Sequence, residues 1–164
     1  MTYELRPEGL DFLARAPRTW RFEAGVAAPR PTVFGAISGD PSEWKSWFPG
    51  LSSGRYEGDG PPGVGSVRQV RMSGVTYRET VVSWVQDERW AYRVDRCSVP
   101  MARALVEEWA TEDAGDGTLV RWTFAIEPRV LFRVGQPLAP TVMSRLFRRA
   151  MAKLSTELAS RERG

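Results

Sequence analysis

Two residues of opposite charge, Arg68 and Glu79, have the clearest potential for chemistry in this sequence. They lie on two segments, 66–72 and 75–85, that flank a Ser-Gly dipeptide at 73–74. Such a dipeptide between two strand-like segments is typical of a two-residue hairpin turn. Pairing the strands backwards from that turn sets Arg68 directly opposite Glu79. We therefore expect an arginine–glutamate pair across one antiparallel strand pair.

The same pairing decides which way this pair points. The face that holds Arg68 and Glu79 also carries Val70, Tyr77 and Val81, whereas the opposite face is mostly polar. The more apolar face of a strand pair turns inward, so we expect the two charges in the interior. Three interpretations remain open. The pair anchors a ligand carbonyl, hydroxyl or carboxylate, or it is an ion pair that only completes the sheet, or Glu79 is a general base whose pKa burial has raised.

Aromatic side chains form the second group of candidates. The segments 105–111 and 118–126 flank a glycine-containing turn at 114–117, and pairing outward from it sets Trp109 opposite Trp122. The side chains expected to line a cavity from the sheet are Tyr77, Tyr92, Trp109, Trp122 and Phe124. A wall of this kind suits a flat, largely apolar guest. The alternative is that these rings are ordinary core residues, because aromatic bodies with polar tips serve both uses.

A long amphipathic segment, 138–161, must position these residues from the other side. Its apolar side chains recur at steps of three to five, which places them on one helical face. Prolines at 137 and 140 suit the first turn of a helix, where no amide donor is needed. Met143 and Phe147 on this face are either core or an adaptable part of a pocket.

The remaining segments supply the rest of an antiparallel sheet. We expect strands at 20–26, 51–58 and 90–96 in addition to the four named above, and short helices at 32–38 and 42–47. Trp44, Trp47 and Phe48 then either plug the space between the short helices and the sheet or form its mouth. Residues 1–17 are expected to be an irregular lead-in with a helical turn at 8–15, and 18–161 to be a single α+β domain.

Composition excludes several classes of function. The chain has 164 residues, one cysteine, no histidine and a formal net charge of +3. Without histidine there is no Ser-His or Cys-His nucleophile pair, and only carboxylates could hold a metal. Hence we expect no metal, no cofactor and no nucleic-acid partner. No apolar run reaches membrane-spanning length and no secretory signal is visible, so we expect a cytoplasmic protein without integral membrane association.

The order of these segments and the wording of several motifs resemble the START/Bet v 1-like (SRPBCC) superfamily, in its polyketide cyclase/dehydrase and lipid-transport-like branch. The resemblance covers about residues 18–160. The motifs that carry it are AAPRPTVF at 27–34, DPSEWKSWFPG at 40–50, PGVGSVR at 62–68, YRE at 77–79, the aromatic strand at 90–94 and GTLVRW at 117–122. None of these motifs is specific to a reaction.

The resemblance implies a helix-grip fold, in which a curved seven-stranded antiparallel sheet wraps a long C-terminal helix and two short helices follow the first strand. It implies a cavity between sheet and helix that binds or carries a small hydrophobic ligand of lipid, polyketide or aromatic type. One alternative is a polyketide cyclase, aromatase or dehydratase acting in that cavity, with Glu79 as a weak catalytic candidate. Another is a ligand-dependent partner-binding module. Either a monomer or a homodimer fits the sequence.

Overall fold

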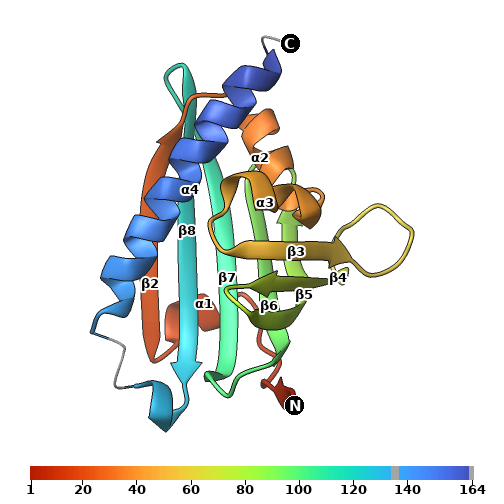
Figure 1. Ribbon diagram of the computed structural model, residues 1–164, viewed down its shortest axis with the longest axis vertical. Helices are drawn as coiled ribbons and strands as arrows, with labels where there is room; N and C mark the ends of the chain where they lie inside the picture. The colour runs from red at the N-terminus through yellow and green to blue at the C-terminus, as the bar shows by residue number, and fades with distance from the viewer. Residues whose placement is uncertain (134–136, 163–164) are drawn as a thin grey trace.

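The computed structural model describes residues 1–133 and 137–162, and their helices and strands form the expected α+β domain (Figure 1). In chain order the elements are β1 (Tyr3–Glu4), α1 (Phe12–Arg15), β2 (Arg18–Val26), α2 (Arg30–Ser38), η1 (Pro41–Glu43), α3 (Trp44–Trp47), β3 (Leu51–Tyr56), β4 (Val67–Met72), β5 (Val75–Val85), β6 (Arg89–Cys97), β7 (Ala102–Ala114), β8 (Gly117–Pro128), η2 (Val130–Phe132) and α4 (Ala139–Glu162).

The sheet is antiparallel and runs in the order β2-β8-β7-β6-β5-β4-β3, with β1 added beside β6. Each strand from β3 to β8 pairs with its neighbour in sequence, as hairpins require, and β2 closes onto β8. Helix α4 crosses the sheet over β2, while α2 and α3 lie near one end (Figure 1). The seven-stranded helix-grip architecture is therefore confirmed.

Both hairpin registers that place the candidate residues are confirmed. Arg68 faces Glu79 across β4 and β5, and Trp109 faces Trp122 across β7 and β8. The register of the first hairpin follows from its turn, in which Ser73 and Gly74 both have positive φ, at 50° and 83°. Two consecutive residues of that kind make the type I′ turn that matches the twist of paired strands.

Helix α4 differs from the expected segment by a single residue at each end. Its inward face is fully buried and consists of Phe147, Ala150, Met151, Leu154 and Leu158. A helix this long stays folded mainly because such a stripe packs on an apolar surface, here the inner face of the sheet. Pro140 lies in its first turn, where the missing amide costs no hydrogen bond.

The lead-in is more ordered than expected: the helical turn expected within 8–15 is α1, and a two-residue strand, β1, precedes it. The pairing of β6 with β7 stops at Arg93 and Val106, and the N-terminal segment enters beyond that point. Its amides at Leu5 and Arg6 donate to β6 and β7 carbonyls at 2.9 and 2.7 Å. These bonds satisfy strand edges that would otherwise be open. No sequence pattern announces such an insertion, because β1 is only two residues long.

The second short helix also needs correction. The expected helix at 42–47 is a 3₁₀ turn followed by a single α-helical turn, and the N-cap of the 3₁₀ turn is Asp40. The Asp40 carboxylate accepts the Ser42 amide at 2.8 Å. Aspartate is as good an N-cap as serine, and Pro41 fixes the first helical position after it.

Candidate functional site

A small cavity lies on the inner face of the sheet, beneath α3. Its volume is about 40 Å³. The residues that line it are Trp44, Phe48, Leu51, Arg68, Val70, Met72, Tyr77, Glu79, Tyr92, Glu107, Trp109 and Trp122. This volume accommodates a few water molecules or the polar end of a larger ligand, and it is well below the size of a typical ligand pocket.

Arg68 and Glu79 form the polar centre of this cavity. Both residues are almost completely buried: Arg68 is 2% exposed and Glu79 is 3% exposed. Arg68 Nε donates a hydrogen bond to Glu79 Oε2 at 2.5 Å. Burial raises the pKa of Glu79, and the adjacent guanidinium opposes that shift. The expectation that these residues point inward is therefore confirmed, whereas their role stays a proposal.

Three aromatic rings surround the Arg68 guanidinium. Its central carbon lies 4.3 Å from the ring centroid of Tyr92, 4.4 Å from that of Trp90 and 5.1 Å from that of Trp44. Aromatic faces attract cations, and the attraction grows where water is excluded. One guanidinium nitrogen, Nη1, is buried and has no hydrogen-bond partner among the described residues. A buried donor without a partner is costly, and because Arg68 lines the cavity, an acceptor placed in the cavity is one way to satisfy it.

Glu107 is a third buried charge at this site, and the sequence interpretation did not single it out. Its Oε2 accepts the Tyr92 hydroxyl at 2.7 Å and the Trp122 indole N–H at 2.9 Å. Burial, followed by the negative charge of nearby Glu79, raises the pKa of Glu107 to about 7, although the two donors oppose the shift. This carboxyl therefore changes protonation near neutral pH.

A sequence signal for Glu107 did exist. The β7–β8 register sets Glu107 opposite Phe124, on the same face as Trp109. Period-two alternation along a strand places residues 107 and 109 on one side, so the face that buries Trp109 must also bury Glu107. The signal was a carboxylate on a strand face that otherwise carries the buried residues Leu105, Trp109 and Thr111.

The aromatic wall is packed on its helix side and open only on its cavity side. The Trp109 and Trp122 rings stack with centroids 5.3 Å apart. Phe147 of α4 is completely buried against them, at centroid distances of 5.9 and 5.8 Å. The free volume lies on the other side of these rings, towards Tyr77 and Arg68. The cavity is thus covered by α3 and does not extend under α4 at this point.

Three expected lining residues do not line this cavity. Phe147 fills the space between α4 and the tryptophans, Phe124 stacks on Trp20 at 5.8 Å, and Met143 is a half-buried part of the main core. The physical reason is that α4 packs directly on β2, and Phe147 packs on the two tryptophans. The six other candidates do line it: Arg68, Tyr77, Glu79, Tyr92, Trp109 and Trp122.

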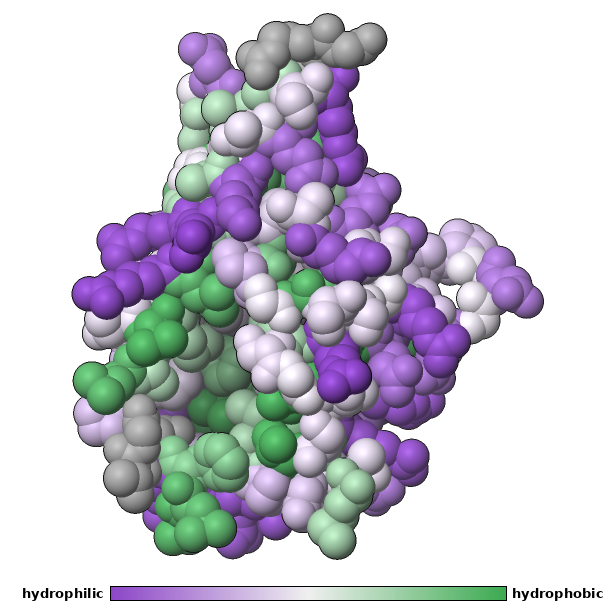
Figure 2. All heavy atoms as spheres, in the orientation of Figure 1, coloured by the Kyte–Doolittle hydropathy of each residue, from purple (hydrophilic) through white to green (hydrophobic). Residues whose placement is uncertain are grey.

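The outer edge of the cavity consists of Leu51, Met72 and Tyr77, all half-buried. Burial raises the pKa of Tyr77, so its hydroxyl stays protonated at neutral pH. That hydroxyl contacts the Met101 sulfur at 3.7 Å. Figure 2 also shows that the molecular surface is hollowed beside the N-terminal half of α4 and that mainly apolar residues surround the hollow.

Neither metal chemistry nor a reactive thiol is evident at the site. Within residues 1–133 and 137–162 no group of three or more acidic, histidine or cysteine side chains is placed to hold a metal ion. Cys97 is buried, and burial raises its pKa away from the reactive thiolate form. No helix in this part of the chain is long and apolar enough to cross a bilayer.

A curved antiparallel sheet that grips a C-terminal helix and encloses a small polar-centred cavity defines the class of helix-grip, ligand-binding folds. The family model "Polyketide cyclase / dehydrase and lipid transport" matches residues 19–159, so the chain belongs to that family of the START/Bet v 1-like superfamily. Uncharacterized proteins of Mycobacterium tuberculosis and Mycobacterium bovis are each 27% identical to it over 124 residues, covering 75% of this chain and 74% of theirs.

Solved structures agree on the fold. A START superfamily protein from Mycobacterium smegmatis superposes with a TM-score of 0.69 at 13% identity, covering 87% of this chain and 97% of that one. The ginseng major latex-like protein 151 from Panax ginseng gives a TM-score of 0.66 at 14% identity, with coverages of 85% and 96%. Identities this low show a shared fold and leave the ligand open.

Proposed function

We propose that this protein binds or carries a small hydrophobic ligand whose polar end enters the cavity at Arg68. The observation that carries the proposal is that Arg68 lines the cavity and that its buried Nη1 donor has no hydrogen-bond partner among the described residues. A ligand oxygen placed there would satisfy it. The rest of the ligand would extend outward past Tyr77, Met72 and Leu51, where the side chains are half-buried.

The charges of the cavity favour a neutral oxygen over a carboxylate. Arg68 supplies one positive charge, Glu79 neutralises it at 2.5 Å, and Glu107 adds a further negative charge whenever it is ionised. A ligand carboxylate would therefore enter a site of zero or negative net charge and would also lose its hydration. A ketone, amide or hydroxyl oxygen accepts the same hydrogen bond without that cost.

A matched pair of probes tests this function. 2-Acetylnaphthalene and 2-naphthoate have the same ring system, and one carries a ketone where the other carries a carboxylate. We expect the ketone to quench the fluorescence of the buried tryptophans and to bind at least ~10-fold more tightly than the carboxylate, a difference of roughly 1.4 kcal/mol. Native mass spectrometry of the purified protein would independently detect a retained hydrophobic ligand.

The matched variants are Arg68→Met/Glu79→Gln and, as a control, Arg78→Met/Glu57→Gln. The first removes both buried charges together, so that neither is left unpaired. The second removes an ion pair at 3.0 Å between side chains that are more than one-third exposed. Ketone binding should weaken ~10-fold or more in the first and stay unchanged in the second. Preference for the carboxylate, or equal ketone binding by all three proteins, would refute the proposal.

One observation favours catalysis as a second candidate. Glu107 lines the cavity and has a pKa of about 7, and a general acid or base works best with a pKa near the operating pH. Its carboxylate also accepts a hydrogen bond from the Tyr92 hydroxyl. Glu79 suits that role less well, because Arg68 holds it. The cyclase or dehydratase alternative therefore rests on Glu107. Turnover of a polyketide-like ketone that disappears in Glu107→Gln, while ketone binding remains, would establish it. Equal turnover would exclude it.

A further inference from the structure

Large apolar side chains are exposed in one short region of the surface. Residues 130–142 contain five of the eight large hydrophobic side chains that are exposed in the described part of the chain. These five, which we call the apolar rim, are Val130 (63% exposed), Leu131 (83%), Phe132 (42%), Leu138 (71%) and Val142 (62%). Three come from η2, Leu138 immediately precedes α4, and Val142 lies in the first turn of α4. Figure 2 shows apolar surface gathered there, beside the hollow described above. Exposed apolar groups this concentrated mark an interaction site.

The same region holds the positive charge of the molecule. Residues 128–156 contain six basic side chains and no acidic one: Arg129, Arg133, Arg145, Arg148, Arg149 and Lys153. The whole chain has 23 basic and 20 acidic residues, so the remainder has 17 basic and 20 acidic residues and a formal net charge of −3. The basic character of the chain is therefore confined to this segment. Charge asymmetry on this scale creates a directional electrostatic field.

Helix α4 presents both features on its outward side. Leu138, Val142, Arg145 and Arg149 follow one another at helical spacing, and all four are exposed. The apolar members lie at the start of the helix and the arginines lie one and two turns further along. Among the described residues, no carboxylate forms an ion pair with Arg145, Arg148 or Arg149. The cations are thus available for an external partner.

We propose that the apolar rim docks on the surface of an anionic lipid bilayer. Leu131, Phe132 and Leu138 would enter the boundary between headgroups and acyl chains, while the arginines behind them contact anionic headgroups. This combination of apolar insertion and electrostatic attraction is how peripheral segments bind membranes. Docking in this orientation would place the hollow beside α4 at the bilayer surface.

The composition of the surface favours a bilayer over other partners. A nucleic acid would use the arginines but would leave five apolar side chains in water. A protein partner could cover the apolar rim, but it would not explain why six basic side chains and no acidic one lie in the same segment. An anionic bilayer satisfies both sets of side chains at once. The inference does not depend on the identity of the cavity ligand.

Co-sedimentation with sucrose-loaded vesicles tests the proposal. Vesicles of phosphatidylcholine alone are compared with vesicles in which phosphatidylglycerol replaces part of the phosphatidylcholine. We expect binding only to the anionic vesicles, and weaker binding as salt is raised, because salt screens the headgroup charge. Arg148→Gln/Arg149→Gln should lower the partition coefficient roughly fivefold for each charge removed. Leu131→Ser/Phe132→Ser should lower it at least ~10-fold, because both side chains lose their apolar insertion.

Three controls separate docking from general effects. Val64→Ser removes an exposed apolar side chain from a distant loop, and Arg55→Gln/Arg71→Gln removes two exposed charges from β3 and β4. Both should bind vesicles like the wild type, and so should Arg68→Met/Glu79→Gln, which alters only the cavity. Equal binding to neutral vesicles, or normal binding by the Leu131→Ser/Phe132→Ser variant, would overturn the proposal. Tighter binding of duplex DNA than of anionic vesicles would overturn it as well.

Discussion

Arg68, Glu79 and Glu107 place three ionisable side chains inside one cavity that is otherwise mostly apolar. Ionised groups lose their hydration there, so each needs a partner or must become neutral. Glu79 has Arg68 as its partner. Glu107 has only neutral donors, Tyr92 and Trp122, and responds with a raised pKa. The protonation of this one carboxyl is therefore the most pH-sensitive property of the site.

The raised pKa of Glu107 predicts a specific pH dependence of stability. In the unfolded chain the carboxyl ionises near its ordinary value of 4.5, whereas in the folded protein it ionises at about 7. Between these values the folded protein retains a proton that the unfolded chain has lost. The free energy of unfolding should therefore fall as pH rises through this window, by about 3 kcal/mol in total, and level off above it.

Glu107→Gln should remove this decline. The amide oxygen can still accept from Tyr92 and Trp122, but it has no charge to bury. Denaturant unfolding monitored by tryptophan fluorescence should show the variant gaining stability relative to the wild type as pH is raised from about 5 to about 8. Glu112→Gln, on the same strand but exposed, is the control. Parallel pH profiles for wild type and Glu107→Gln would contradict the assignment.

The Arg68–Glu79 pair predicts a strongly non-additive mutant cycle. Arg68→Met leaves Glu79 buried without a cation and should cost about 3–5 kcal/mol of unfolding free energy. Arg68→Met/Glu79→Gln buries no unpaired charge and should cost clearly less than the sum of the two single changes. Urea unfolding of the four proteins measures this coupling. Additive costs would show that the two charges do not interact in the folded protein.

Sequence reasoning identified the polar pair and the aromatic lining that the strands supply, but not Glu107 or the contact with the short helix. Arg68 and Glu79 could be placed because a recognisable turn fixes their register within one hairpin. The ring of Trp44 over Arg68 could not be placed, because the contact joins a short helix to a strand 24 positions away. Local patterns determine which face a side chain occupies, whereas contacts between elements depend on packing.

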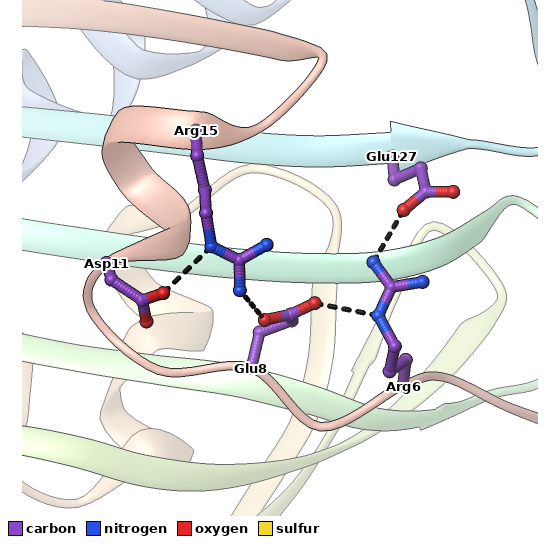
Figure 3. Close-up of polar contacts among 5 residues, drawn as sticks. All are labelled: Arg6, Glu8, Asp11, Arg15 and Glu127. Atoms are coloured by element: carbon purple, nitrogen blue, oxygen red, sulfur yellow. Dashed lines mark hydrogen bonds and ion pairs between the residues drawn. The ribbon is translucent and has the colours of Figure 1, made fainter.

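At the level of elements, the N-terminal segment is the largest difference from the expected structure. Figure 3 shows how charges hold it: Glu8 accepts from both Arg6 and Arg15, Arg15 also binds Asp11 at 2.8 Å, and Arg6 reaches Glu127 of β8 at 2.6 Å. Most of these groups are exposed, so each ion pair contributes little by itself. They orient the segment, and burial must supply most of its stability.

That burial comes from Phe12 on the outer face of the sheet. Its side chain is 1% exposed and packs with Ala104, Val106 and Ala125, where small residues leave room for a ring. Phe12→Ala should cost about 3–5 kcal/mol if the whole domain depends on the contact. We expect the loss to be partly local, with faster hydrogen exchange at the Leu5 and Arg6 amides that bridge β6 and β7.

Hydrogen exchange with mass spectrometry distinguishes the two extents of damage. In Phe12→Ala, exchange should rise first in residues 1–17 and at the splayed ends of β6 and β7, and only slightly in the β4–β5 hairpin. Ala14→Gly, at an exposed position of the same short helix, controls for changes in helix propensity. Unchanged exchange in residues 1–17 would show that Phe12 does not hold the segment.

For the whole molecule, sequence patterns supplied the hairpins, and the family resemblance supplied their closure. The β4–β5 and β7–β8 hairpins follow from alternation and turn residues. The pairing of β2 with β8 joins strands about 100 positions apart, from Arg18 opposite Ile126 to Val26 opposite Thr118. No local pattern selects that partner, because any edge strand offers the same hydrogen bonds. The insertion of β1 beside β6 could not be predicted either, because no local pattern selects β6 as its partner.

The cavity depends on most of the domain. Its lining comes from α3 and from every strand between β3 and β8. The binding site is therefore intact only while the whole sheet is folded. Binding should therefore stabilise the domain globally rather than locally, by about 2.7 kcal/mol at a free ligand concentration of roughly 100 times Kd.

In a domain of this size that stabilisation corresponds to a rise in Tm of roughly 5–10 °C. With 2-acetylnaphthalene in such excess, differential scanning calorimetry should show one transition that moves upward as a whole. The Arg68→Met/Glu79→Gln variant should show a much smaller shift at the same probe concentration, because the donor that holds the ketone is absent. A shift of equal size in this variant would place the bound probe somewhere other than the Arg68 cavity. A second transition that does not move would mean that the cavity and the rest of the sheet unfold independently.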